Sequence, residues 1–218
     1  MSVGRTPGIE DLFSDGPHLG SYSYEIGNPN LDLEKTIGIE TSLQYKGDMF
    51  SFKMNGFVNN SPNFHQYTQM GECTEPFVTG KPHPCAGADF IEWGSGSSGW
   101  LYKYQMIGMK TQISGGEIQL TYFGKRFDIT TDLSLVRGKD TSNQHYLPYM
   151  PADKLKILFS TKSDQNLSGN LRLTRGFRQN RISEFETITP GYFLTDIYGS
   201  YSFNAFKSFL YMGPLNIL

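Results

Sequence analysis

The most regular feature of this sequence is an alternation of apolar and polar residues along several long segments. Apolar, aromatic or β-branched residues occupy every second position in Thr36–Lys46, and the same period of two recurs in Phe127–Val136 and Phe193–Phe203. Side chains of a β-strand point alternately to its two faces, so these segments predict strands with one apolar and one polar face. Helical spacing is nearly absent, and the single segment that suits a helical turn is Pro7–Phe13.

The alternation and the turn residues together predict an all-β chain of about eight long strands. We place these strands at about 33–46, 49–65, 100–123, 126–138, 152–163, 168–180, 190–203 and 206–213. The third is interpreted as one strand bent at Gly115 and Gly116, because glycines inside a strand often mark a bulge. Most of the eight are longer than an ordinary strand of about five or six residues.

The connections between these strands alternate between short and long. Short turns are predicted at 46–48, 124–126, 163–167 and 204–205, and long segments at 66–99, 139–151 and 181–189. A transmembrane β-barrel keeps its short turns at one end and its long loops at the other, and its tilted strands need about ten residues to cross. The pattern therefore favours an antiparallel transmembrane β-barrel. The alternative is a large soluble antiparallel sheet with one face in water.

In a barrel the apolar face of each strand would meet lipid and the polar face would line the lumen. The residues predicted to face the lumen are Glu40, Gln44, Lys53, Asn55, Glu117, Gln119, Asp128, Asp132 and Arg172. Aromatic residues near strand ends would form belts at the membrane surfaces, namely Tyr45, Phe50, Phe52, Tyr122, Phe127, Tyr192, Tyr201 and Phe203. Core packing in a soluble sandwich would explain the same aromatic residues, and periodicity alone does not separate the two interpretations.

Composition narrows the possible functions. The chain has 19 Lys and Arg against 21 Asp and Glu, for a net charge of −2, so it lacks the basic surplus that nucleic-acid binding requires. No run approaches the roughly 18 apolar residues of a membrane helix, and residues 1–5 do not resemble the apolar core of a signal peptide. Neither a Gly-x-Ser-x-Gly elbow nor a cysteine with a credible base partner is present, so we expect neither an enzyme nor a cofactor.

Several spaced motifs resemble one family. They are Arg5-Thr6-Pro7-Gly8-Ile9-Glu10-Asp11-Leu12-Phe13, Gly16-Pro17-His18, and Gly27-Asn28-Pro29-Asn30-Leu31 followed by Glu34. Weaker matches follow in order at Ser114–Glu117, Leu147–Pro151, Leu194–Phe203 and 211–217. Together they look like the barrel of TonB-dependent outer-membrane receptors, and the resemblance covers nearly the whole chain outside 70–98.

This resemblance implies that the eight strands are part of a 22-stranded barrel in the outer membrane of a Gram-negative-type bacterium. The implied function is a fragment of a receptor that imports a scarce nutrient, most often a ferric siderophore or another metal chelate. The implied partners are outer-membrane lipid and the TonB energy-coupling complex, which acts through a plug domain. Signal, coupling motif, plug and final strand are not found in the sequence, so we expect a fragment. Two alternatives stay open: a stand-alone eight-stranded outer-membrane barrel with a structural or adhesion role, and a soluble β-sheet binding module.

The long segment 66–99 contains the two cysteines of the chain, Cys73 and Cys85. In a protein bound for an oxidising compartment, two cysteines in one loop predict a local disulfide. Closing a loop of about 13 residues contributes roughly 3 kcal/mol in the chain-entropy model. The alternatives are a metal site that adds His83, whose spacing matches no standard zinc motif, and a pair of free thiols.

Candidate substrate contacts come from residues predicted to lie in or beside the outer loops. They are His18, His65, His83, His145, Arg178 and Arg181. The histidines would meet a metal chelate, or else be ordinary solvated residues. The arginines belong to a series at 172, 175, 178 and 181, in which Arg172 and Arg178 would face the lumen and Arg175 the lipid or its headgroups. Such arginines suit an anionic chelate or the phosphates of the outer leaflet, or they pair with Glu184 and Glu186.

Overall fold

The computed structural model describes residues 2–93, 100–162, 167–203 and 208–212, and nearly all of them lie in strands or in the connections between strands. One helix, α1 (Ile9–Phe13), forms within the segment predicted to be helical. None of the described helical segments has the length and apolar character needed to span a membrane. The expected turn at 204–205, most of the turn at 163–167 and the end of the motif at 211–217 lie outside the described residues.

The described strands number twelve. They are β1 (Ser2–Arg5), β2 (Asp15–His18), β3 (Ser23–Ile26), β4 (Glu34–Lys46), β5 (Phe50–Gln69), β6 (Ile91–Trp93), β7 (Trp100–Phe123), β8 (Phe127–Asp140), β9 (Lys154–Thr161), β10 (Leu167–Gly176), β11 (Tyr192–Phe203) and β12 (Ser208–Met212).

Eight of these strands lie where the alternation of apolar and polar residues predicts them, and four short ones do not follow from it. The strands β1, β2, β3 and β6 have three or four residues each, which is too short for a period of two to be recognised. Two expected boundaries were wrong. Strand β5 continues to Gln69, into the expected loop, and β10 ends at Gly176 instead of 180.

The sheet follows the order β1-β4-β5-β7-β8-β9-β10-β11-β12. Along this path β1 pairs antiparallel with β4, and each strand from β8 to β12 pairs antiparallel with the next. Strand β3 adds a short parallel pairing to β7. Within the described residues the two ends of this path, β1 and β12, are not paired with each other, so the sheet is open. The fold class predicted from the sequence, an all-β antiparallel sheet of the barrel type, is confirmed.

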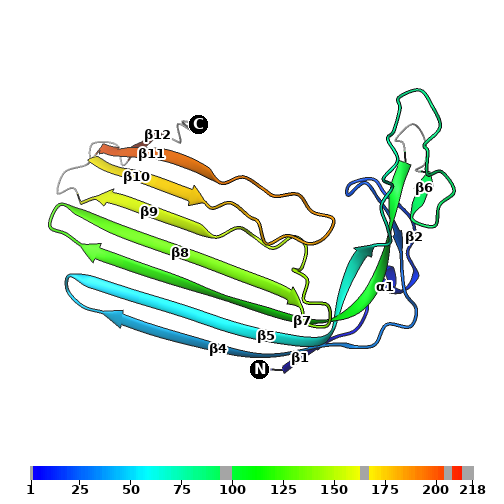
Figure 1. Cartoon of the computed structure of the whole chain (residues 1–218). Coiled ribbons are helices and arrows are strands. Elements are labelled where there is room, and N and C mark those ends of the chain that lie inside the picture. The colour runs from blue at the N-terminus through cyan, green and yellow to red at the C-terminus, as the bar shows by residue number, and fades with distance from the viewer. Residues whose placement is uncertain (1, 94–99, 163–166, 204–207, 213–218) are drawn as a thin grey trace. The chain divides into compact units, whose positions relative to one another are not determined.

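The chain divides into two compact units. The loop unit consists of residues 1–38, 60–112 and 140–144, and the sheet unit of residues 39–59, 113–139 and 145–218. In the sheet unit, three-residue turns join β4 to β5 and β7 to β8 at the same end of the sheet (Figure 1).

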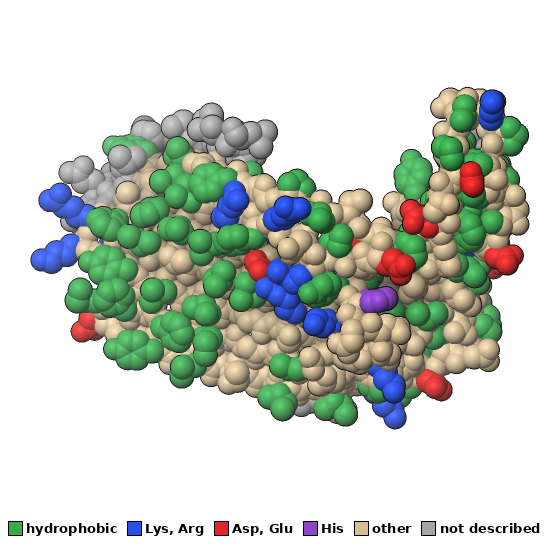
Figure 2. Space-filling model, viewed as in Figure 1, with side chains coloured by type: hydrophobic (Ala, Val, Ile, Leu, Met, Phe, Trp, Pro, Cys, Tyr) green, Lys and Arg blue, Asp and Glu red, His purple; other side chains and the backbone are tan. Residues whose placement is uncertain are grey.

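The register of the sheet unit separates an apolar face from a polar face. Leu133 of β8 is opposite Leu155 of β9, whereas the neighbouring Asp132 is opposite Lys156. On the apolar face many large side chains are open to the surroundings, and Ile39 is 77% exposed. Figure 2 shows hydrophobic side chains spread over this part of the molecule.

The hydrophobic side chains buried among the described residues are few. They are Ile91, Leu101, Met106 and Leu147. A soluble sheet buries its apolar face against another layer, because apolar surface in water is costly. Here the apolar face of the sheet unit has no covering layer among the described residues, and lipid is the solvent that suits such a face.

The loop unit begins with a compact arrangement of β1, α1 and the hairpin of β2 and β3. A Cβ atom added at Gly27 would lie 2.6 Å from the backbone of Leu12 and Phe13, so only glycine allows the chain after β3 to pass this close to α1. The amide of Gly27 donates a hydrogen bond to the carbonyl oxygen of Ser14 at 2.7 Å. The Gly-Asn-Pro motif thus has a structural role.

Candidate functional site

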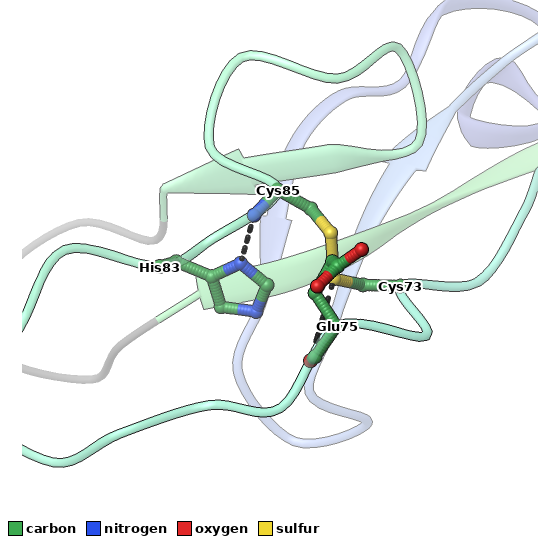
Figure 3. Close-up of a disulfide and its surroundings, with 4 residues drawn as sticks. All are labelled: Cys73, Glu75, His83 and Cys85. Carbon is green, nitrogen blue, oxygen red and sulfur yellow. Dashed lines mark hydrogen bonds between the residues drawn. A yellow bond between two sulfur atoms is a disulfide. The ribbon is translucent and has the colours of Figure 1, made fainter.

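A disulfide between Cys73 and Cys85 closes the long loop between β5 and β6 (Figure 3). The two Cα atoms are 6.1 Å apart and the cysteines are separated by 12 positions in the sequence. Because both cysteines belong to the same loop, the bond constrains that loop without attaching it to a strand. The segment between positions 73 and 85 is thereby closed into a ring.

His83 supports this disulfide from inside the loop. Its Nδ1 atom accepts a hydrogen bond from the backbone amide of Cys85 at 3.1 Å (Figure 3). The imidazole ring lies 5.7 Å from the ring of Phe77 and 5.6 Å, edge to face, from that of Trp100. An imidazole that accepts at Nδ1 and is neutral carries its proton on Nε2. His83 is therefore fixed between two aromatic rings.

The same residues form the one cluster of possible metal ligands found among the described residues. Donor atoms of Cys73, His83 and Cys85 lie within 4.8 Å of one another. Cysteine binds metals as a thiolate, however, and here both sulfur atoms are joined in the disulfide. The Nδ1 lone pair of His83 is also occupied by the Cys85 amide. The geometry therefore fits a cross-linked loop better than a metal centre.

His18 lies at the tip of the β2–β3 hairpin in the loop unit. Its Nδ1 atom is 2.8 Å from Oε1 of Glu25, which also accepts a hydrogen bond from the hydroxyl of Ser23 at 3.0 Å. The imidazole is mostly exposed, with 63% of its side-chain surface accessible. His18 is thus available to solvent, but it is already paired with a carboxylate.

His65 does not have the exposed position that its sequence context suggested. Its side chain is completely buried, and Nε2 contacts the carbonyl oxygen of Asp32 at 2.8 Å. The His65 amide donates to Oε2 of Glu34 at 3.2 Å, and the same oxygen accepts from Arg5 at 3.0 Å. The expectation that His65 contacts substrate was wrong, because no ligand can reach a fully buried ring. Glu34, which ends the Gly-Asn-Pro motif, organises this network.

A carboxylate that sequence analysis did not single out organises the loops of the sheet unit. Asp153, just before β9, accepts two hydrogen bonds from the guanidinium of Arg137, at 2.5 and 2.8 Å. Arg181 donates to the same carboxylate at 3.0 Å. Hydrogen bonding from Arg137, with the charges of both arginines, lowers the pKa of Asp153 against the opposing effect of burial. A single acidic residue beside a strand gives no pattern that would reveal this role.

Arg181 thus pairs with a carboxylate, as one interpretation of the arginine series expects, but the carboxylate is that of Asp153 and not that of Glu184 or Glu186. Glu186 instead accepts hydrogen bonds from the backbone amides of Tyr149, at 2.7 Å, and Ser183, at 2.8 Å. The carboxylate of Glu186, in the loop that follows β10, thus accepts a hydrogen bond from the backbone of the loop that precedes β9. Arg181 reaches past its own loop to Asp153.

Gln179 makes a second link between the loop that follows β10 and the loop that precedes β9. It is buried, and its side-chain amide donates to the carbonyl oxygens of Met150 at 2.9 Å and Pro151 at 3.2 Å. The two remaining candidates of the sheet unit, His145 and Arg178, are exposed. Neither forms an ion pair with a residue that the structure describes.

The polar face of the sheet unit contains a hollow of about 290 Å³. Its lining includes Lys53, Asn55, Glu117, Gln119, Asp132, Ser134, Lys154 and Lys156. The first five of these are residues that the alternation predicts to face the lumen. Within the hollow, the side-chain amide of Gln119 donates to Asp132 at 2.7 Å. The hollow therefore presents ammonium groups and carboxylates together on the face opposite the apolar one.

Comparison with known proteins places this geometry in one family. The family described as "TonB dependent receptor-like, beta-barrel" matches residues 2–213. Among solved structures, the copper transporter OprC is similar over 92% of this chain and 28% of its own, with 18% identity and a TM-score of 0.70.

Two other solved structures are siderophore receptors of Pseudomonas aeruginosa. The ferric enterobactin receptor PfeA, as the R480A mutant in complex with enterobactin, aligns with 92% of this chain and 30% of its own, with 16% identity and a TM-score of 0.60. The siderophore receptor PirA aligns with 93% of this chain and 32% of its own, with 16% identity and a TM-score of 0.58. At these identities the likeness shows the fold, and the chain spans about a third or less of the length of each. The match over residues 2–213 shows that this chain belongs to the family of TonB-dependent receptor β-barrels.

Proposed function

We propose that the chain forms part of the barrel wall of an outer-membrane receptor that imports a scarce nutrient, specifically a ferric siderophore or another metal chelate. The observation that carries this proposal is the separation of the sheet into an exposed apolar face and a polar face with its own charged hollow. Such a wall places lipid on one side and an aqueous passage on the other.

The similar solved structures support a metal-containing cargo. One is a copper transporter and two are receptors for siderophores. Their cargoes share a metal ion, either alone or inside an organic chelator. A chelate is favoured here because the loop closed by the disulfide presents exposed apolar side chains, Phe77 and Val78, beside the histidine ring of His83. Aromatic surface with a few polar groups suits an organic ligand.

The recognition surface would consist of the outer loops 66–99, 139–151 and 181–189. Among the candidate residues, His18, His145 and Arg178 are exposed, and His83 is partly buried. Arg178 suits an anionic chelate best, because guanidinium groups bind carboxylate and catecholate oxygens through directed hydrogen bonds. Arg181 is less suited to this role because Asp153 already engages it.

Import through such a wall needs an energy source and a moving part. In the proposed receptor the TonB complex supplies the energy through a plug domain, which would lie against the polar face. The ammonium groups of Lys53, Lys154 and Lys156 in the polar hollow would meet either the plug or a passing anionic chelate. These partners belong to the receptor as a whole.

The test uses the full receptor chain that contains these residues, expressed in cells that lack their own ferric-siderophore receptors. Uptake of radioactive iron supplied as a ferric catecholate is compared with uptake of copper. We expect chelate-dependent iron uptake, with Arg178→Ala lowering the apparent affinity and Lys125→Ala, an exposed cation of the short turn between β7 and β8, leaving it unchanged. Uptake of neither metal above the level of cells without the receptor would overturn the proposal.

A further inference from the structure

The long loop between β5 and β6 is anchored on β7 by contacts that do not involve its disulfide. The amide of Met70, at one end of the loop, donates to the carbonyl oxygen of Lys103 at 2.9 Å. At the other end, the carbonyl oxygen of Phe90 accepts from the Lys103 amide at 2.8 Å. A Cβ atom added at Gly71 would lie 2.9 Å from Cγ of Phe90, so the two ends also touch each other. One residue of β7 therefore holds both ends of the loop.

The two cysteines lie close to these anchored ends. Cys73 is two positions after Gly71, and Cys85 is five positions before Phe90. The amide of Ala88 donates to the carbonyl oxygen of Cys85 at 3.1 Å, which folds the chain between Cys85 and Phe90 into a turn. If the disulfide opens, both sulfur atoms therefore stay attached to a backbone that other bonds hold in place.

The imidazole of His83 completes a set of three ligand groups with the two sulfur atoms. The ring contacts Phe77 and Trp100, and its donor atom lies within 4.8 Å of the sulfur atoms of both cysteines (Figure 3). Two thiolates and one imidazole are a ligand set that zinc accepts in proteins, with a fourth position left for another ligand. In the cross-linked loop neither sulfur atom is a thiolate, because each is bonded to the other. The disulfide thus keeps this ligand set closed.

The charge around the loop favours a cation. Residues 70–90 contain the carboxylates of Glu72, Glu75 and Asp89 against the single ammonium group of Lys81, and all four residues are exposed. A surplus of negative charge on one surface raises the local concentration of cations. Of the cations available to such a surface, those that prefer sulfur and nitrogen over oxygen suit the three ligand groups.

We propose that the loop is a redox-controlled metal site, closed as the disulfide and able to bind Zn²⁺ through Cys73, His83 and Cys85 once the disulfide is reduced. Binding through Nδ1 of His83 replaces the hydrogen bond from the Cys85 amide by a bond to the metal. The anchoring on β7 keeps the two thiols near the imidazole, so the reduced loop needs little rearrangement. This site goes beyond the cargo recognition proposed above and does not depend on it.

The reductant is a small thiol. Two molecules of it donate one electron and one proton each to the disulfide, whose S–S bond breaks, and they leave joined as a disulfide of their own. Zn²⁺ then displaces one proton from each of the two protein thiols, since cysteine binds metals as a thiolate. Removal of the metal returns the loop to a form that a disulfide oxidant closes again.

The experiment uses the full receptor chain in detergent, without oxygen, and measures Zn²⁺ binding by competition with a coloured zinc indicator. The chain is compared with its disulfide intact and after reduction by a water-soluble phosphine, which takes up the oxygen of a water molecule and leaves both sulfur atoms as thiols. We expect the reduced chain to bind one more Zn²⁺ ion than the oxidised chain. Zn²⁺ should also slow the alkylation of Cys73 and Cys85 in the reduced chain.

The variants separate the ligands from the rest of the loop. The double variant Cys73→Ser and Cys85→Ser should lose the additional Zn²⁺. His83→Gln should weaken its binding at least about tenfold, since changes to groups that merely support a metal ligand already cost a factor of about 10–100. The matched control is Thr79→Gln, which puts the same side chain at an exposed position of the same ring and should leave the affinity unchanged.

Two outcomes would overturn the proposal. One is equal Zn²⁺ binding, and equal alkylation, before and after the metal is offered to the oxidised and the reduced chain. The other is the same affinity in His83→Gln and Thr79→Gln, which would show that the imidazole is not a ligand. Heat-dependent migration in gels checks that each variant contains a folded barrel.

Discussion

The sheet unit and the disulfide loop of the loop unit are stabilised in different ways. In the sheet unit, each strand is held by a continuous ladder of backbone hydrogen bonds, as between β10 and β11, where ten residues pair in register. The loop between β5 and β6 depends instead on a few individual groups, the disulfide and the His83 ring. The difference shows that the wall tolerates changes of side chain if the alternation is preserved, whereas the loop depends on particular atoms.

The largest effect should come from a charge on the apolar face. Ile118→Lys puts an ammonium group on the face that we assign to lipid, and charged residues near the middle of the membrane cost roughly 2–4 kcal/mol. Gln119→Lys is the matched change on the polar face, where Asp132 remains as a partner. We expect a large loss of folded barrel, measured by heat-dependent gel migration, in the first variant only. Equal tolerance of both would contradict the assignment of the faces.

A smaller and more local effect is expected when the disulfide is removed. The double change Cys73→Ser and Cys85→Ser should destabilise the loop by about 3 kcal/mol, the value expected for a ring of this size. Limited proteolysis should then cut between the two positions, while heat-dependent migration of the barrel stays as in the unchanged chain. Loss of the barrel itself would show that the loop supports the wall.

The smallest effect should come from the loops of the sheet unit. Asp153→Asn removes the charge that holds Arg137 and Arg181, for a loss of roughly 1–2 kcal/mol, since the groups are partly exposed. Because folding lowers the pKa of Asp153, its stabilisation is complete at neutral pH. It begins to disappear as the pH falls below the ordinary value of 3.8 and is lost below the folded pKa.

Protease resistance of the loops, measured along an acid titration, checks this prediction. The unchanged chain should lose resistance in acid, and Asp153→Asn should have the lower resistance at every pH with a weaker acid response. An unaltered response in the variant would place the acid-sensitive group elsewhere. Asp128→Asn, which removes the partner of the more exposed Lys162, serves as the control and should change little.

The alternation of residues was sufficient to predict the wall but not the loops. Eight strands follow from it, because side chains that face lipid alternate along a pleated strand with side chains that face the lumen. The burial of His65 does not follow, since it depends on Glu34 and Asp32, which are more than thirty positions away in sequence. The same holds for Asp153, whose partners Arg137 and Arg181 come from two different segments. Contacts between distant single residues leave no period in a sequence.

The short turns of the sheet unit constrain how this chain can change in evolution. The turn between β7 and β8 has three residues, and every side chain beyond it has an assigned face. Insertion of one residue within β8 would send Leu133 and its apolar neighbours into the lumen and their polar neighbours into lipid. Changes of length must therefore accumulate at the other end, in the long loops, where new recognition surfaces can arise without altering the wall.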